Sequence, residues 1–136
     1  MKKRNITMSL IVLLAVCTWA ACSKSVPVDE DGLLITTRKD CYVSSFELLG
    51  TDYVTVRVGP ATIDTVAQTV KVTVLFGSDL KHLYPQFSLA QDCKLNPKIT
   101  GFVDFSDTLN PKKWTVISGD RQVKKDYSVI VSVQPR

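Results

Sequence analysis

Hydrophobic and polar residues alternate along much of this chain with a period of two. In one stretch Val70, Val72 and Val74 fall on one face, while Lys71 and Thr73 fall on the other. A period of two is typical of a β-strand with one buried face, whereas a helix repeats every 3.6 residues. The pattern predicts about seven strands, within the stretches 42–49, 53–58, 68–76, 86–91, 98–105, 112–118 and 126–133.

Turn-forming residues separate these stretches at short intervals. Glycine, proline, asparagine and aspartate cluster between them, which is typical of hairpins and short loops. Only residues 78–84 suggest a helix, a single turn that Ser78 or Asp79 could cap and Pro85 would end. Short alternating strands without a long helix predict an all-β fold, a two-sheet antiparallel sandwich.

The first 21 residues are typical of an export signal. Lys2, Lys3 and Arg4 precede a mostly apolar run that ends before Cys22, and a bilayer-spanning helix needs about 20 apolar residues. The small pair before Cys22 makes this stretch resemble a bacterial lipobox. The resemblance implies cleavage before Cys22, alkylation of its thiol with diacylglycerol and acylation of its amino group, for example with palmitate. Cys17 and an ordinary cleaved signal are the alternatives.

Removing the signal changes the charge of the chain. Three of the 17 basic residues and none of the 13 acidic ones lie in residues 1–21, so the net charge falls from +4 to +1. No basic stripe with interleaved aromatic residues remains, and we therefore expect no nucleic-acid partner. The predicted organisation is a lipoprotein signal peptide at 1–21, a lipidated N-terminus with an acidic tether at 22–40, and a β-sandwich domain at 41–136.

The acidic run Asp29, Glu30 and Asp31 lies in this predicted tether. It resembles the surface-export signal of Bacteroidetes lipoproteins, although it begins later after Cys22 than is usual there. A calcium loop would need further oxygen ligands that do not follow. The run therefore favours a solvated spacer and gives weak support to surface display.

Cys41 and Cys93 are the two cysteines within the predicted domain. In an exported protein an even pair of cysteines predicts a possible disulfide. In the chain-entropy model this bridge would add roughly 4 kcal/mol to the free energy of unfolding. Two buried thiols that act as small apolar residues are the alternative.

Several motifs resemble a recurrent domain of Bacteroidetes lipoproteins, over roughly residues 44–133. The resemblance implies an immunoglobulin-like β-sandwich with no assigned activity, found beside glycan-capturing or glycan-cleaving modules. The matching positions are Ser45, Phe46, Gly77, Asp79, Leu80, Leu83, Pro85, Phe87, Asp104, Phe105, Ser106, Tyr127 and Val129.

The chain offers little for catalysis. His82 is the single histidine, so one chain can build neither a catalytic triad nor a multi-histidine zinc site. Asp104 and Asp107 could form a glycosidase pair, but a capped turn is the preferred interpretation. We therefore predict a protein that is not an enzyme and uses no cofactor or metal.

Two kinds of site remain. Trp114 and Tyr84 are the possible glycan contacts, with Tyr53 and Tyr42 as further candidates. Trp114 shares a face with buried positions, which favours a core role, whereas Tyr84 is the better surface candidate.

Asp-Thr-Val and Asp-Thr-Leu resemble the O-glycosylation acceptor of exported Bacteroidetes proteins, which implies possible sugars on Thr65 and Thr108. Asp-capped turns are the alternative.

The sequence thus predicts a non-catalytic, lipid-anchored protein of the cell envelope, at the outer membrane. Its membrane face is left open, and its sandwich displays a binding or spacer surface for envelope proteins or glycans. The alternative is an accessory glycan-binding subunit of a polysaccharide-uptake system.

Overall fold

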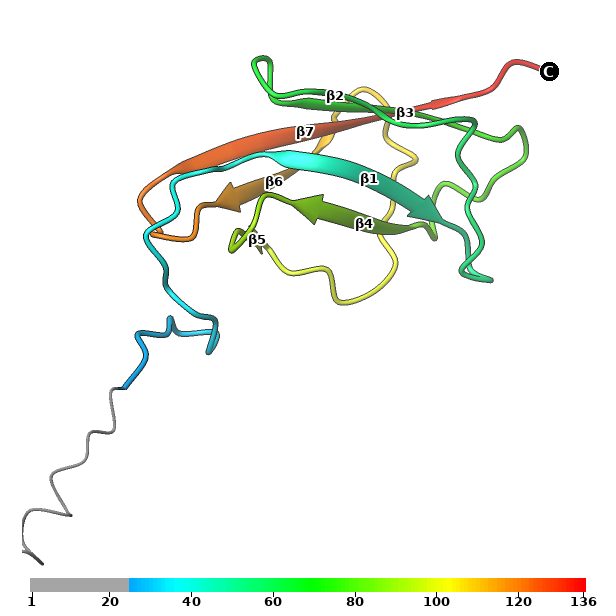
Figure 1. Ribbon diagram of the computed structural model, residues 1–136. Helices are drawn as coiled ribbons and strands as arrows, with labels where there is room; N and C mark the ends of the chain where they lie inside the picture. Colours follow the sequence, from blue (N-terminus) through cyan, green and yellow to red (C-terminus); the bar gives the residue numbers. More distant parts are fainter. Residues whose placement is uncertain (1–24) are drawn as a thin grey trace, which may run out of the picture.

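The computed structural model describes residues 25–136, and they form seven strands in two sheets without a helix (Figure 1). One sheet pairs β1 with β4, and the other has the order β2-β3-β7-β6-β5. The strands are β1 (Val43–Leu49), β2 (Thr62–Asp64), β3 (Thr69–Val74), β4 (Tyr84–Leu89), β5 (Lys94–Asn96), β6 (Lys112–Ile117) and β7 (Lys124–Val133). The all-β prediction with seven strands in two sheets is confirmed; an immunoglobulin-like topology stays a prediction.

One pairing corrects the expected antiparallel arrangement. β3 and β7 run parallel, with Val70 opposite Val129 and Val72 opposite Val131, whereas the other strand pairs are antiparallel. Parallel neighbours need a long crossover connection. Here β4, β5 and β6 lie between β3 and β7 in the chain and supply it.

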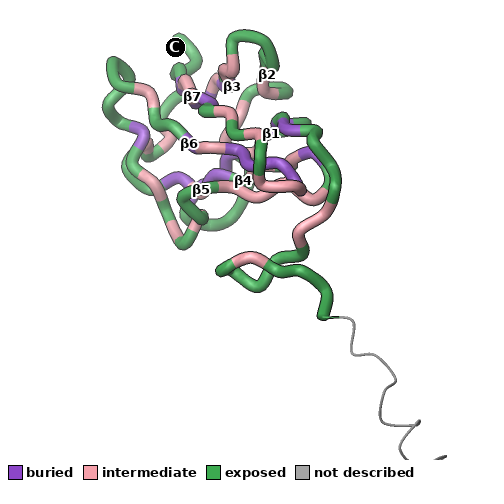
Figure 2. The backbone as a smooth tube through the Cα atoms, turned by 90° about the vertical axis from the view of Figure 1, so that its left-hand side faces the viewer, coloured by how far each residue is buried: buried purple, intermediate pink, exposed green. Residues whose placement is uncertain are grey.

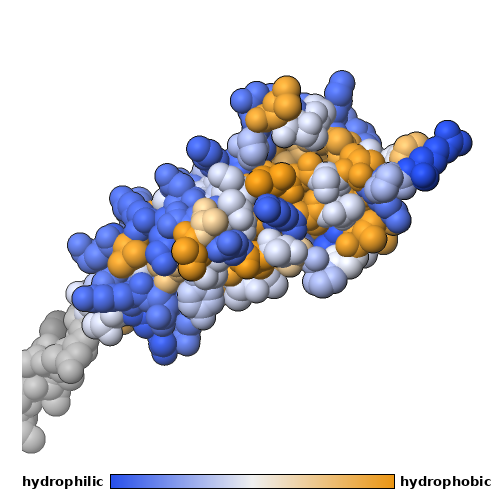
Figure 3. Space-filling model, turned by 90° about the horizontal axis from the view of Figure 1, so that it is seen from above, coloured by the Kyte–Doolittle hydropathy of each residue, from blue (hydrophilic) through white to orange (hydrophobic). Residues whose placement is uncertain are grey.

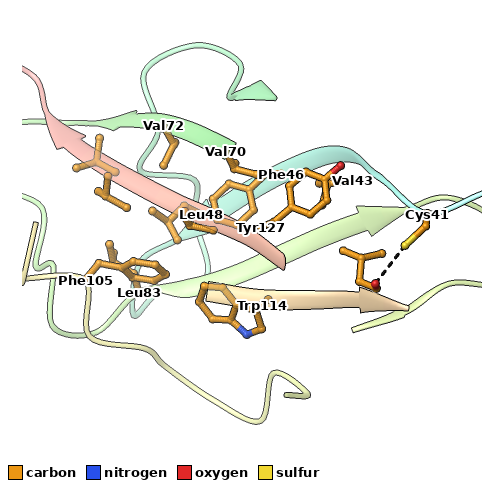
Figure 4. Packing of buried hydrophobic residues seen from close by; sticks show 14 residues of the cluster. Cys41, Val43, Phe46, Leu48, Val70, Val72, Leu83, Phe105, Trp114 and Tyr127 are labelled. Carbon is orange, nitrogen blue, oxygen red and sulfur yellow. Dashed lines mark hydrogen bonds between the residues drawn. The ribbon is translucent and has the colours of Figure 1, made fainter. Parts of the chain in front are cut away.

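The alternating residues build a core between the two sheets (Figure 4). Val70, Val72 and Val74 of β3 are each at most 3% exposed, as the period of two predicts. Phe46 of β1 and Tyr127 of β7 pack into the same cluster. Figure 2 shows the buried positions along the strands and the exposed ones in the loops and the N-terminal segment.

Two predicted strands are wrong. The stretch 53–58 bridges β1 through Thr55 and then β3 through Arg57, so it crosses between the sheets instead of extending either one. In the stretch 98–105, Val103 makes one isolated bridge, with Leu83. The short strands β2 and β5 replace them, and with three residues each they are too short to show alternation.

The predicted helical turn at 78–84 is also wrong. Asp79 does cap a turn, because its side chain accepts the backbone N–H of Lys81 at 3.0 Å and its carbonyl accepts that of His82 at 3.3 Å. The chain then enters β4 at Tyr84 without completing a helix. Within residues 25–136 no helical stretch has the length and apolar character needed to span a bilayer.

Candidate functional site

Three aromatic side chains meet at one end of the sandwich. Tyr53 lies in the loop after β1, Tyr84 begins β4, and Phe102 lies in the loop between β5 and β6. Their ring centroids are 5.8 Å apart for Tyr53 and Tyr84, 5.6 Å for Tyr53 and Phe102, and 6.1 Å for Tyr84 and Phe102. We call these three residues the aromatic triad.

The strand pairing explains why residues so far apart in sequence meet. Leu49, at the end of β1, lies opposite Tyr84 at the start of β4. Leu83 and Val103 exchange two backbone hydrogen bonds, of 3.2 and 2.7 Å, which bring Phe102 to the same place. This end of β1 and β4 lies opposite the N-terminal segment (Figure 1).

Tyr53 is held in an unusual backbone conformation. Its φ is 59°, in the left-handed region that aromatic residues seldom adopt. The turn is fixed by Gly50, whose N–H donates to the Val54 carbonyl at 2.9 Å and whose carbonyl accepts the Tyr53 N–H at 3.0 Å. Conformations of this kind cluster at functional sites.

Two residues of the triad are exposed, and Tyr84 is half-buried. Tyr53 is 61% and Phe102 40% exposed, although each ring packs against two other aromatic rings. Adjacent exposed aromatic faces are typical of binding surfaces, and tyrosine adds a hydroxyl that can donate or accept a hydrogen bond. Such a surface can stack on the apolar face of a ring-shaped ligand.

Two hollows flank the triad. Tyr84 lines a groove of about 550 Å³ between β4 and β5, together with Gln86, Ser88 and Lys98. Phe102 lines a second hollow of about 300 Å³, to which Lys98 also contributes. The aromatic faces are therefore continuous with a groove lined by residues of β4 and β5.

The opposite end of the sandwich is charged and internally paired. Lys94 contacts three carboxylates, those of Asp29 at 2.9 Å, Asp31 at 3.0 Å and Glu30 at 3.1 Å. Arg121 contacts Asp29 at 3.0 Å. We call these residues, with Lys98 bound to Asp31 at 2.8 Å, the acidic clasp.

Asp29 is the centre of the clasp. Its side chain is 3% exposed, against 10% for Lys94 and 14% for Arg121. Its second oxygen accepts the backbone N–H groups of Asp31 at 3.0 Å and Leu33 at 2.9 Å. The hydrogen bond from Lys94 is the main cause that holds the pKa of Asp29 well below its usual range. The clasp is satisfied within the chain and leaves no free cation for a ligand.

The acidic run thus lies in a different setting from the solvated tether expected from the sequence. Val28 bridges Leu34, and Thr36 donates its backbone N–H to Gly119 at 2.9 Å, so residues 28–36 fold back on the body. The boundary between tether and domain stays a prediction. Cys22 and its lipidation lie outside the described residues, as does Cys17.

Trp114 is a core residue. It is 5% exposed and packs on Phe87 and Phe105, with ring centroids 5.2 and 6.0 Å away. Its ring is covered on the inner face of β6, so it is not presented to a glycan. Of the two possible glycan contacts, Tyr84 lies in the triad and Trp114 does not.

Asp104 and Asp107 cap turns. Asp104 accepts hydrogen bonds from the N–H and the hydroxyl of Ser106, at 2.8 and 2.6 Å, and Asp107 accepts the side-chain amide of Asn110 at 2.8 Å. These bonds lower the pKa of both carboxyls, so neither is suited to act as a general acid. Within residues 25–136 no three histidine, cysteine, aspartate or glutamate side chains gather as a metal site.

Thr65 and Thr108 lie in two turns of the same kind. Asp64 accepts the N–H groups of the residues two and three positions on, and Asp107 does the same. Both threonines are exposed. The aliphatic residue after each is almost fully exposed, 92% for Val66 and 89% for Leu109. Both motifs are capped turns, and their glycosylation stays a prediction.

The two thiols of the domain are free in the structure, and Cys93 contacts the residue directly before Cys41. Cys41 is buried and donates to the Val116 carbonyl at 3.1 Å, the dashed line in Figure 4. Cys93 is partly exposed and donates to the Asp40 carbonyl at 3.0 Å. Burial is the main cause that raises the pKa of both thiols.

Comparison with known proteins identifies the family. Residues 50–131, more than half of the chain, match the family model described as "SGBP, N-terminal", where SGBP stands for surface glycan-binding protein. The chain belongs to this family. The SGBP domain is a binding domain, which fits a protein expected not to be an enzyme, and it replaces the expectation of a domain without assigned activity.

Three solved structures from Bacteroides are similar to the SGBP domain, and each match covers 71% of this chain. A protein of B. thetaiotaomicron, provisionally named a glycoside hydrolase, is 25% identical with a TM-score of 0.59. A secreted protein of B. fragilis is 11% identical and a DUF4623 family protein of B. eggerthii 20% identical, both with a TM-score of 0.51.

The match covers 26% of the B. thetaiotaomicron chain, 97% of the B. fragilis chain and 22% of the B. eggerthii chain. The SGBP domain here therefore spans about a quarter of the first structure. Among curated proteins no match is found.

The triad could be found only in part from the sequence. Tyr84 and Tyr53 were candidates because of their residue type. Phe102 was missed because its flanking residues, Ile99 and Val103, made the stretch resemble a strand. Its position directly after Gly101 was the one local signal for a loop.

Proposed function

We propose that this protein is a non-catalytic glycan-binding module at the bacterial cell surface, serving a polysaccharide-uptake system. The observation that carries this proposal is the aromatic triad, in which the Tyr53 and Phe102 rings are exposed, on a domain of the SGBP family. Sugars offer flat C–H faces that stack on aromatic rings, and Tyr53 and Phe102 leave such faces open to solvent. Glycan binding is thereby favoured over a purely spacing role.

The groove beside Tyr84 supports an extended ligand. It runs between β4 and β5 and has polar groups, such as Gln86 and Ser88, beside apolar ones. Its lysines are neutralised, because Lys94 and Lys98 are bound to carboxylates of the clasp. We therefore favour an uncharged polysaccharide over a sulfated or uronic-acid polymer.

Anchoring belongs to the same proposal. Lipidation of Cys22 would hold the module at the outer membrane, with three acyl chains supplying firm attachment. The family description, which refers to a surface glycan-binding protein, supports display on the outer face.

The binding test uses affinity electrophoresis against β-glucan, xylan, mannan and mucin, followed by titration calorimetry with the polysaccharide that is retained. We expect Tyr53→Ala and Phe102→Ala each to weaken binding about five- to tenfold, and the double variant to abolish retention. Because both side chains are exposed, stability should change by no more than about 0.5 kcal/mol.

Tyr42→Ala is the matched control, since Tyr42 is a 42% exposed tyrosine directly before β1, at the end of that strand away from the triad. Its affinity should equal that of the unaltered protein. Equal loss in the control, or no retention of any polysaccharide by the unaltered protein, would contradict the proposal and favour a spacer.

A further inference from the structure

Cys41 and Cys93 lie where the two sheets meet beside the acidic clasp. Cys41 precedes β1, and Cys93 immediately precedes β5 in the other sheet. The contacts on both sides of Cys41 hold it against the turn at 90–93. The Tyr42 carbonyl accepts the Ala90 N–H at 3.0 Å, and the Asp40 carbonyl accepts the Cys93 thiol at 3.0 Å.

The thiols themselves are neighbours. The Cys93 thiol donates to the carbonyl of Asp40, the residue directly before Cys41, and each thiol affects the pKa of the other. A disulfide needs Cα atoms within about 7 Å, and the contacts of the Asp40 and Tyr42 carbonyls with Cys93 and Ala90 bring the two segments together in the way that such a bridge requires.

The two thiols differ in access. Cys41 is 3% exposed, and carbonyl groups of Val116 and Val123 accept its hydrogen at 3.1 and 3.6 Å. Cys93 is partly exposed and lines the open groove between β4 and β5. A bulky oxidant can reach Cys93 in the folded protein but not Cys41.

We propose that Cys41 and Cys93 are a disulfide site in which Cys93 is the entry thiol and Cys41 the resolving thiol. An external disulfide, either a thiol-disulfide exchange protein or oxidised glutathione, is the oxidant. The Cys93 thiolate attacks it, forming a mixed disulfide and releasing one external thiol. The Cys41 thiolate then attacks the Cys93 sulfur and releases the second external thiol. The two cysteines lose two protons and two electrons, and the external disulfide gains them.

The bridge would have a specific structural effect. It joins the segment that leads from the clasp into β1 to the start of β5, across the gap between the sheets. A force applied at the N-terminus would then be borne by both sheets. This inference does not depend on the proposed glycan binding.

The first test measures the masses of Cys41- and Cys93-containing peptides from the exported full chain, alkylated under denaturing conditions before reduction. We expect one linked peptide pair, lighter by two hydrogen atoms and unalkylated until a reductant is added. Quantitative alkylation of both cysteines without reduction, even after incubation with oxidised glutathione, would overturn the proposal.

A pair of single variants tests the order of events. In native buffer with oxidised glutathione, Cys41→Ser should accumulate one glutathione on Cys93, at least about tenfold faster than Cys93→Ser acquires it on Cys41. Denaturant should remove the difference, because it exposes Cys41. Equal rates in native buffer would contradict the assigned order. Timed alkylation of the reduced unaltered protein, with Cys93 labelled first, gives the same answer if a serine variant fails to fold.

Discussion

The two ends of the sandwich differ in the side chains that they carry and in how far these are exposed. At the clasp end, Lys94 and Arg121 carry charges that are mostly covered, and Asp29 contacts both. At the triad end, Tyr53 and Phe102 carry apolar rings that largely face solvent. A covered charge needs a partner within the fold, whereas an exposed ring is satisfied only by something outside it. We therefore assign a structural role to the clasp end and propose the triad end as the binding surface.

The surface shows a similar contrast. Hydrophilic side chains cover the end next to the N-terminal segment, whereas apolar ones gather toward the C-terminal end (Figure 3). Leu75 and Phe76 are exposed apolar residues near the C-terminus, since the Gln134 N–H donates to the Val74 carbonyl and Arg136 lies over the Phe76 ring. The charged end is thus continuous with the chain leading to the predicted anchor, and the apolar end lies farther from it.

Removing the centre of the clasp should give the largest effect on stability. Asp29→Asn leaves Arg121 covered without a carboxylate partner, while Lys94 keeps Asp31 and Glu30, and an unpaired covered charge is strongly destabilising. Glu30→Gln is the matched control, because Glu30 contacts the same lysine but its side chain is 82% exposed. Thermal unfolding should show a severalfold larger fall in Tm for Asp29→Asn. Equal falls would mean that the clasp is a surface ion pair.

The same network sets the response to pH. The pKa of Asp29 is lowered, so its stabilisation is present above its ordinary value of about 3.9 and is lost as pH falls below it. The pKa of Lys94 is raised, chiefly by its hydrogen bond to Asp29, so its stabilisation is lost only above about pH 10.4. Unfolding by denaturant should give a plateau between roughly pH 5 and 10, and Asp29→Asn should lower the plateau and flatten the acid limb. An unchanged acid limb would contradict this role.

Glycine-to-alanine substitutions, which add one methyl group, can compare how tightly the two ends are packed. A Cβ at Gly119 would collide with Thr36 Oγ1 and lie 3.0 Å from the Asp92 Cβ, whereas one at Gly101 would meet nothing within 4 Å. Gly119→Ala should therefore lower the free energy of unfolding by about 1–3 kcal/mol, and Gly101→Ala by no more than about 0.5 kcal/mol. Chemical denaturation measures both changes. Thr36→Ala should restore part of the loss in Gly119→Ala. Equal costs at the two glycines would show that the clasp end is not the more tightly packed one.

The smallest effect concerns the two capped turns that hold Thr65 and Thr108. If Thr65 and Thr108 carry sugar, the intact mass of the exported protein should exceed that of the lipidated chain. Thr65→Ala and Thr108→Ala should each remove one glycan, with little change in Tm because both positions are exposed. A mass accounted for by the lipid alone would end the glycosylation hypothesis.

Alternation predicted the strands that have one buried face. β1, β3, β6 and β7 were found because residues such as Val129 and Val131 recur every second position against the core. The stretch around Val54 and Val56 alternates as well, yet it bridges first one sheet and then the other, which no local pattern reveals. The parallel pairing of β3 with β7 likewise depends on tertiary structure.

The site was harder to predict for the same reason. Tyr84 was identified as a surface aromatic, but its neighbours Tyr53 and Phe102 reach it only through strand pairing. The clasp joins Asp29 to Arg121 across 92 positions, so the acidic run looked like a solvated spacer. Sequence can mark which residues need a partner, but it does not say whether the partner lies within the fold.

The most direct measurement maps a bound oligosaccharide onto the domain by amide chemical-shift perturbation, with a fragment of the best-retained polysaccharide. We expect shifts concentrated at residues 50–56, 83–84 and 101–103, extending along β4 and its groove as far as Asp31 and Leu33, with none at residues 118–121. Shifts centred on the clasp, or saturable binding that leaves the triad unperturbed, would contradict this expectation.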